Sequence, residues 1–199
     1  MQKSLQVAMV AVFTSAIVGS DFVLAPYVDV KLLDTLVFVA SFVFGLRVGA
    51  SVAVLSETIW GFVSPFGMAG AILPFLVGGE LLFALAGYGA SRIWKYSDRT
   101  GPLSIRNLFF GAILSICAFA WDFETNLATG LLAGATSVPS LLAYEVYGIP
   151  FMIAHEISDF ALGSLLAPGV IALSWRMVAM RGPQSVARGT GTFRSEGRE

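Results

Sequence analysis

A polar stretch inside an apolar segment is the first place in this chain where chemistry is possible. Residues 119–130, FAWDFETNLATG, carry an Asp, a Glu and an Asn in a segment without Lys or Arg that extends from residue 108 to residue 135. Four polar residues at helical spacing share one helix face: Asp122, Thr125, Asn126 and Thr129. Glu124 points away from that face. A carboxylate accepts hydrogen bonds and an Asn also donates them, so this face is suited to bind a small polar molecule.

A second polar stretch, HEISD at residues 155–159, puts His155 and Asp159 on one helix face. It is one residue short of H-E-x-x-H, in which two His side chains hold zinc and the Glu acts as general base. Asp can replace a His as ligand, but the chain has a single His, so any third ligand must be a carboxylate. A membrane-embedded metalloenzyme using His155, Glu156 and Asp159 therefore stays a less favoured interpretation.

Composition indicates what kind of protein holds these groups. Of 199 residues, 56% are hydrophobic and 13% are charged, and the mean hydropathy is +0.79, which is typical of an integral membrane protein. A net charge of −1 argues against a nucleic-acid partner. The chain has no phosphate-binding loop of the G-x-x-x-x-G-K-[ST] type, so we expect no ATP hydrolysis by the chain itself.

The apolar runs predict an all-α integral membrane domain over residues 1–180, with six transmembrane helices. These are expected at residues 5–24, 32–44, 48–63, 71–94, 108–134 and 149–179. The second and third helices join tightly through Gly45 and Gly49. Both are short for a bilayer core of ~30 Å, so they are either thinly inserted or covered by the others.

The basic residues predict the orientation. One side of the six-helix arrangement receives Lys3, Arg47, Arg92, Lys95, Arg99, Arg106, Arg176, Arg181, Arg188, Arg194 and Arg198. By the positive-inside rule this side, with the N- and C-termini, is cytoplasmic. The opposite loops are expected to hold Asp21, Asp29, Asp34 and Glu145 against one Lys31. The Gly-, Ser- and Arg-rich residues 181–199 predict a disordered cytoplasmic tail.

Charged groups inside membrane helices indicate where a binding site lies. Each costs about 2.5–3.5 kcal/mol at the bilayer centre and therefore faces protein or water. Polar and aromatic candidates from four helices converge on the outer half of the membrane: Glu57, Trp60, Glu80, Trp121, Asp122, Asn126, His155 and Asp159. We expect a pocket open to the outside, although such groups also simply hold helices together. Because this pocket has carboxylates and no expected Lys or Arg, its ligand should be neutral or cationic.

Three segments resemble the substrate-binding (S) components of energy-coupling factor (ECF) vitamin transporters. Residues 28–67 are similar to the second and third helices of that family, with the Gly45-x-x-x-Gly49 turn followed by a polar position. Residues 79–94, GELLFALAGYGASRIW, resemble its fourth helix. Residues 121–134, WDFETNLATGLLAG, resemble its fifth. The resemblance covers residues 5–179.

The resemblance implies a cell-membrane protein that is not an enzyme and has no cofactor. It would bind a vitamin or related micronutrient from outside and work with a separate membrane coupling subunit and two ATPase subunits. Helix one of the family docks on the coupling subunit through an Ala-x-x-x-Ala surface. In this sequence the corresponding helix has the pairs of small residues Ser4/Ala8 and Ala11/Ser15. Nickel and cobalt members have His after the first Met; here Gln2 disfavours metal uptake. A self-contained proton-coupled carrier is the other alternative.

Overall fold

The structure is a computed structural model that describes residues 2–94 and 104–180, and these residues form helices and no strand. The helices are α1 (Lys3–Leu24), α2 (Leu33–Phe44), α3 (Leu46–Val63), the 3₁₀ turn η1 (Gly70–Ile72), α4 (Leu73–Ile93), α5 (Ile105–Leu132), α6 (Val138–Leu165) and α7 (Ala167–Met180). The predicted all-helical class is confirmed. Four helical segments are long and apolar enough to cross a membrane, or five if the bent pair α6 and α7 is one span. Residues 181–199, which the sequence predicts to be a disordered tail, lie outside the described residues, as do Lys95 and Arg99.

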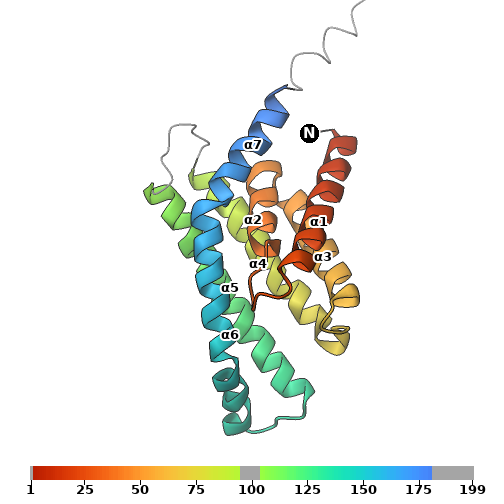
Figure 1. Cartoon of the computed structure of the whole chain (residues 1–199), viewed down its shortest axis with the longest axis vertical. Coiled ribbons are helices and arrows are strands. Elements are labelled where there is room, and N and C mark those ends of the chain that lie inside the picture. Colours follow the sequence, from red (N-terminus) through yellow and green to blue (C-terminus); the bar gives the residue numbers. More distant parts are fainter. Residues whose placement is uncertain (1, 95–103, 181–199) are drawn as a thin grey trace, which may run out of the picture.

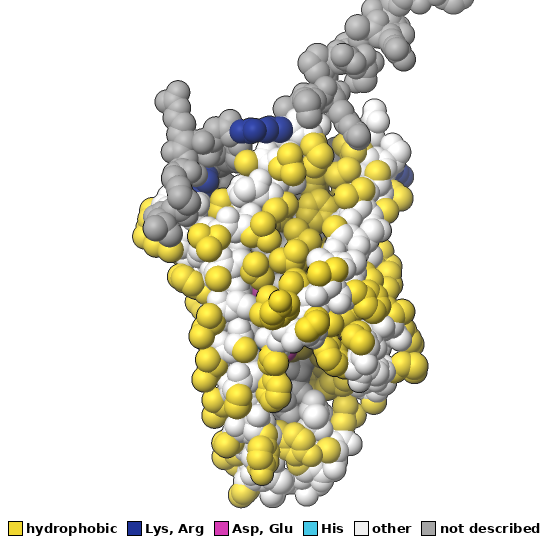
Figure 2. Space-filling model, viewed as in Figure 1, with side chains coloured by type: hydrophobic (Ala, Val, Ile, Leu, Met, Phe, Trp, Pro, Cys, Tyr) yellow, Lys and Arg dark blue, Asp and Glu magenta, His cyan; other side chains and the backbone are white. Residues whose placement is uncertain are grey.

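Helices α1 to α6 run alternately down and up, and α7 continues upward from α6 (Figure 1). The N-terminus, the end of α4, the start of α5 and the end of α7 lie at the upper end, and α5 and α6 extend furthest downward. The Lys and Arg side chains visible in Figure 2 lie at the upper end, above a face that is largely apolar. Large hydrophobic side chains are exposed on most of the helices, a surface that suits lipid rather than water.

The short helix α2 lies at the centre of the bundle, where it is buried over residues 33–42 and contacts α1, α3, α4, α5, α6 and α7. Its shortness therefore reflects coverage by other helices, one of the two expected explanations. Gly45 separates α2 from α3 with φ 91°, a conformation that favours glycine. A Cβ at Gly49 would overlap Ser41, whose Oγ donates to the carbonyl of Ala84 at 2.5 Å. Small residues thus bring α2, α3 and α4 into close contact.

The predicted start of the sixth helix at residue 149 is wrong. Helix α6 begins at Val138, where Ser137 caps it and forms a capping box with Ser140. Pro150, one residue after the predicted start, lies inside α6. Glu145 consequently belongs to a helix and not to a loop. The predicted single helix also breaks, because α6 and α7 meet at 44°.

Two acids expected in outer loops also lie in helices. Asp21 is buried in the last turn of α1 and Asp34 is buried in the first turn of α2. The Asp21 carboxylate accepts a hydrogen bond from the backbone N–H of Leu32 at 3.3 Å. The Oγ of Ser158 in α6 donates to the carbonyl oxygen of Asp29 at 2.9 Å. These bonds hold the loop between α1 and α2 within the bundle.

Candidate functional site

His155 on α6 is the centre of the site, with 1% of its surface exposed. Its Nδ1 lies 3.0 Å from Oδ2 of Asp122 on α5, and its Nε2 lies 3.3 Å from Oδ2 of Asp34 on α2. Asp159, one turn further along α6, places Oδ2 4.0 Å from the same Nε2. Together with Glu80 on α4, these residues are the acid–histidine cluster. Four helices therefore contribute to one buried group of titratable side chains.

The cluster has more acceptor atoms than donors. A neutral imidazole carries one N–H, so it can donate to Asp122 or to Asp34 but not to both. Within the described part of the chain, Oδ1 of Asp34, both carboxylate oxygens of Asp159 and both of Glu80 have no hydrogen-bond partner. Buried polar atoms without partners cost about 1–3 kcal/mol each, and more when charged. The arrangement is therefore completed by protons or by a cation.

Glu80 intensifies the negative character of the cluster. It is fully buried, and its carboxyl group lies beside that of Asp34. Two ionised carboxylates cannot form a hydrogen bond with each other, because neither carries a donor. Glu57 on α3 is also buried and adds a carboxylate near Asp34 and Glu80. These residues come from three different helices, so the negative charge results from tertiary packing and not from one sequence motif.

Lys31 supplies positive charge that the sequence analysis did not place in the site. It precedes α2, and its Nζ lies 4.4 Å from the centroid of the Trp121 ring. Burial by itself lowers the pKa of Lys31, but the carboxylates of Asp34, Glu57 and Glu80 raise it above its ordinary value. Lys31 therefore stays protonated at neutral pH. The expectation of a site without Lys or Arg is wrong, because the loop carrying Lys31 folds into the bundle.

Trp121 forms a wall between Lys31 and His155. Its ring meets the imidazole edge-on, with centroids 5.6 Å apart and an interplanar angle of 86°. The indole Nε1 donates to the carbonyl of Leu76 on α4 at 3.2 Å. A Cβ at Gly79 would overlap the indole, so a glycine is needed at this contact. The ring is thus held by α4 on one side and bounds the cluster on the other.

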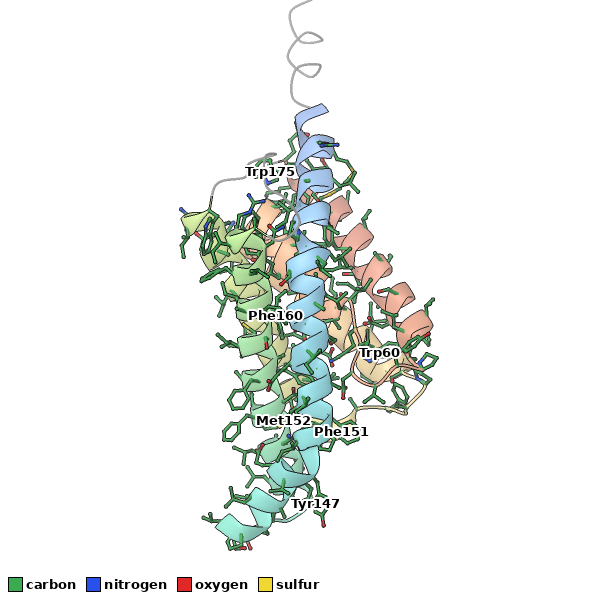
Figure 3. The ribbon with its side chains drawn as sticks, turned by 60° about the vertical axis from the view of Figure 1, so that its left-hand side comes forward. Trp60, Tyr147, Phe151, Met152, Phe160 and Trp175 are labelled. Carbon is green, nitrogen blue, oxygen red and sulfur yellow. The ribbon has the colours of Figure 1, made fainter. Side chains whose placement is uncertain are left out.

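A cavity of about 540 Å³ adjoins the cluster. It is lined by the end of α1 and the following loop, including Asp21 and Lys31, and by Trp60, Phe66 and Phe151. Trp60 and Phe151 come from different helices and both lie below the middle of the molecule (Figure 3). Because Lys31 lines the cavity and also lies over the Trp121 ring, it stands at the boundary between cavity and cluster.

The rest of the polar stripe on α5 makes its contacts outside the cluster. The hydroxyl of Thr125 donates to the carbonyl of Trp121 at 2.9 Å, and that of Thr129 donates to the carbonyl of Thr125 at 2.7 Å. Asn126 packs on Gly148 of α6, where a Cβ would overlap its amide, and it lies beside Glu145. The structure therefore separates Asn126 from Asp122, which contacts His155.

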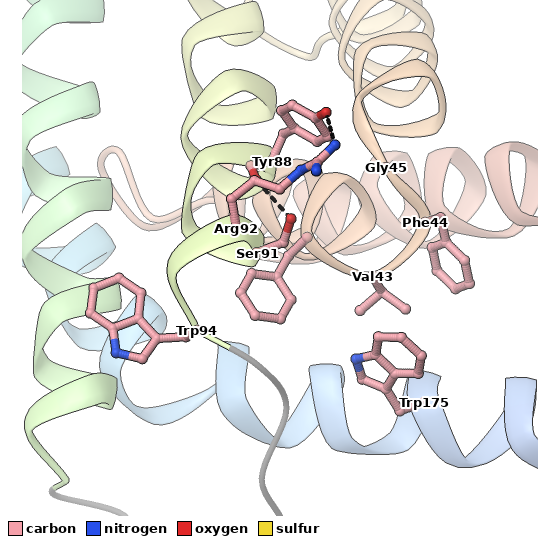
Figure 4. Close-up of a pocket in the computed structure, with 9 residues that line it drawn as sticks. Val43, Phe44, Gly45, Tyr88, Ser91, Arg92, Trp94 and Trp175 are labelled. Carbon is pink, nitrogen blue, oxygen red and sulfur yellow. Dashed lines mark hydrogen bonds between the residues drawn. The ribbon is translucent and has the colours of Figure 1, made fainter.

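A second cavity of about 570 Å³ lies at the opposite, upper end. Figure 4 shows it between α2, α4 and α7, with Trp94 and Trp175 among its walls. The Arg92 guanidinium donates to the Tyr88 hydroxyl, and the Ser91 hydroxyl donates to the Tyr88 carbonyl at 2.7 Å. No carboxylate is among its described lining residues. Its chemistry therefore differs from that of the acid–histidine cluster.

Of the predicted site residues, the structure brings Glu80, Asp122, His155 and Asp159 into one cluster, with Trp121 and Glu57 beside it. Trp60 instead lines the neighbouring cavity. Asp34 was missed as a site residue, although it fell inside the predicted helix at residues 32–44, where a buried charge should have drawn attention.

The chain was also compared with known proteins. No family model matches it, and neither a curated protein nor a solved structure matches it. A functional assignment therefore depends on the acid–histidine cluster, on its cavity and on the distribution of charge.

Proposed function

We propose that this chain is the substrate-capture subunit of an ECF-type importer in the cell membrane. It binds a small neutral or cationic micronutrient from outside and passes it on with a membrane coupling subunit and two ATPase subunits. The observation that carries this proposal is the buried acid–histidine cluster with its unpartnered carboxylate oxygens. Lys31, beside the cluster, also lines a cavity remote from the basic end of the molecule.

The proposal includes six membrane crossings with cytoplasmic termini. The centrally placed α2 counts as one crossing, since other helices cover it, and α6 with α7 count as one broken crossing. Described basic residues at helix ends, among them Lys3, Arg47 and Arg106, belong to the upper end, which the positive-inside rule makes cytoplasmic. The cavity beside Trp60 then faces the outer half of the membrane.

The charge of the site supports a neutral or cationic solute. Four carboxylic acids of the cluster stand against one imidazole and the ammonium group of Lys31. An anionic ligand would add to this excess and would have Lys31 as its partner. A cation or a hydrogen-bond donor instead satisfies the orphaned oxygens of Asp159 and Glu80.

The surface of α1 supports the expected docking of a coupling subunit. The four small residues of the predicted docking face, Ser4, Ala8, Ala11 and Ser15, are all exposed. Small side chains let a second helix approach closely. Ala11 also lines a groove shared with Arg47 and Val48 of α3. The partner helix is therefore expected against α1 and the start of α3.

Ligand binding by the purified chain tests the proposal. The protein in lipid nanodiscs is titrated calorimetrically, without ATP, against a panel of neutral and cationic vitamins and their precursors. We expect one compound to bind, and Asp159→Asn to weaken that binding at least about 10-fold because it removes a buried charge. The matched control is Glu156→Gln, which changes a half-buried acid three residues away. A panel without any binder, or equal affinities of both variants, counts against the function.

The same carboxylates favour one alternative, a self-contained proton-coupled carrier. Oxygens without partners on Asp159 and Glu80 are suited to take up protons. Vesicles that contain this chain alone separate the two functions. Solute uptake driven by a pH gradient supports the carrier, whereas uptake only with the coupling and ATPase subunits supports the importer.

A further inference from the structure

We infer that the acid–histidine cluster is a binding site for a divalent first-row transition metal ion. Asp34, His155 and Asp159 coordinate the ion, and Asp122 orients the imidazole. The inference rests on the proposed function, because both assign ligand binding to this cluster. The inference goes further and names the chemical class of the ligand. The sequence analysis considered His155 and Asp159 as metal ligands of an enzyme but did not include Asp34 in the site.

The three ligand atoms lie close enough together for small side-chain shifts to complete a metal site. One atom from each of Asp34, His155 and Asp159 lies within 4.8 Å of the other two, and all three residues are buried. Ligands about 2.1 Å from an ion lie roughly 3.0–3.4 Å apart in octahedral or tetrahedral geometry. The distance of 3.3 Å between His155 Nε2 and Asp34 Oδ2 already meets this value. Asp159, at 4.0 Å, needs to approach by less than about 1 Å.

Asp122 supplies the second requirement, an oriented imidazole. Its Oδ2 lies 3.0 Å from Nδ1 of His155 and can accept the ring proton there. Ligating His side chains usually donate their other N–H to such a carboxylate, which fixes the tautomer and makes the ligand more basic. With the proton on Nδ1, the lone pair of Nε2 faces the carboxylates of Asp34 and Asp159. That meeting of acceptors needs either a proton on one of the groups or a cation between them.

Glu80 is independent evidence for a cation. It belongs to α4, which contributes none of the three ligands, and it is fully buried with both carboxylate oxygens unpartnered among the described residues. Its carboxyl group is directed at that of Asp34. An ion bound by Asp34 would neutralise this contact and would accept Glu80 as a further ligand. One imidazole and several carboxylates form a nitrogen and oxygen donor set, which suits Zn²⁺, Mn²⁺ or Fe²⁺.

Metal binding by the full-length chain tests the inference. The protein in nanodiscs is stripped with a chelator, dialysed and titrated with Zn²⁺, Mn²⁺ or Mg²⁺. Co²⁺ serves as a spectroscopic probe, because its visible absorption reports the number and kind of its ligands. We expect one ion per chain, with Zn²⁺ or Mn²⁺ preferred to Mg²⁺, and a Co²⁺ spectrum of mixed nitrogen and oxygen ligation.

Three variants locate the ion. His155→Gln should lower the affinity at least about 100-fold, and Asp122→Asn about 10–100-fold, as expected for a residue that orients a ligand. Glu156→Gln, which changes the residue beside His155, should bind within about 2-fold of the parent. Circular dichroism shows whether each variant is folded, and the titration of the parent protein needs no variant.

The outcomes separate this inference from the proposed function. If the stripped parent binds no ion, or if His155→Gln binds as the folded parent does, the metal site is refuted, even where an organic solute binds. If an ion binds with the expected variant pattern and no organic solute binds, the metal site stands, and the proposal of a vitamin ligand fails. If neither an ion nor a solute binds, both are refuted.

Discussion

Replacing Gly79 by Ala tests how tightly α4 holds the wall of the candidate site. A Cβ at Gly79 would lie 2.9 Å from Nε1 and 3.0 Å from Cγ of Trp121, and closer still to Cδ1. Ordinary contacts of a Cβ atom begin at 3.4 Å. The indole ring must therefore shift by up to roughly 1 Å, because the competing atoms belong to a rigid ring.

The size of the effect follows from what the ring loses. The shift disrupts the hydrogen bond from Trp121 Nε1 to the carbonyl of Leu76, worth about 1 kcal/mol. Overpacking adds about 1–3 kcal/mol, and the helix preference of Ala over Gly offsets about 1 kcal/mol, so Gly79→Ala should lower the free energy of unfolding by about 1–3 kcal/mol. At about 2–4 °C per kcal/mol for a chain of this size, the Tm should fall by about 2–12 °C. Ligand affinity should fall too, since the displaced ring contacts His155.

Gly78→Ala is the matched control, because it adds the same methyl group one residue earlier in α4. There the nearest atom to the new Cβ is Oε1 of Glu124 at 3.8 Å, an ordinary contact. Alanine favours a helix over glycine by up to about 1 kcal/mol, so this variant should be unchanged or more stable. Thermal unfolding of both variants in the same detergent is followed by circular dichroism. Equal melting temperatures of the two variants would show that Trp121 does not lie against Gly79.

Three further predictions concern charge, capping and packing. Lys31→Met removes a protonated group beside the cluster. A divalent cation should then bind on the order of 10-fold more tightly in calorimetry, a gain of ~1.4 kcal/mol. Weaker binding would contradict the placement of Lys31. Ser137→Ala removes the capping box of α6 and should cost about 1 kcal/mol of stability, seen as faster hydrogen exchange in its first turn. Gly49→Ala overlaps Ser41 and should destabilise the bundle by about 1–3 kcal/mol in thermal unfolding, whereas Gly89→Ala, with open space around its Cβ, should not.

The helix boundaries that the sequence predicts well are those set by local signals. Gly45 ends one apolar run and begins the next, and the observed α2 and α3 agree with the prediction within two residues at each end. A residue with positive φ between two apolar runs marks a break whatever surrounds it. The all-helical class follows for the same reason, because long apolar runs leave few alternatives.

The start of α6 was missed because the prediction followed the apolar run at residues 149–179 and not the capping signal before it. The spacing of Ser137 and Ser140 with Pro139 between them marks a helix start, and the structure uses it. Tertiary contacts with α5 keep the helix intact through Pro150, and no local pattern reports such contacts.

Some residues of the candidate site can be predicted from local sequence, and others cannot. The cost of a charge in a membrane helix was enough to select Asp122, His155 and Asp159 from the sequence. Lys31 was not selected, since it stands in a polar connection and reaches the cluster only through long-range contacts. The hydrogen bond from the Ser158 hydroxyl to the carbonyl oxygen of Asp29 is one such contact, and it joins residues 129 positions apart. Tertiary structure, not residue type, brings the positive charge into the site.

The negative charge of the cluster has a free-energy cost that the folded protein must offset. Four ionised carboxylates at Asp34, Glu80, Asp122 and Asp159 would together cost about 10–14 kcal/mol on insertion scales, as much as the whole stability of a typical fold. Lys31 offsets part of this cost, and protons on the imidazole or on the acids, or a bound cation, must offset the rest. A metal displaces the protons that its ligands carry, so its binding should release protons. The buffer takes up these protons, and the apparent binding enthalpy should therefore change with the ionisation enthalpy of the buffer.

Titrations in phosphate and in Tris measure this release. Identical enthalpies in both buffers would mean that the carboxylates are already ionised without the ion, and the cost argued here would then be met by other groups of the fold.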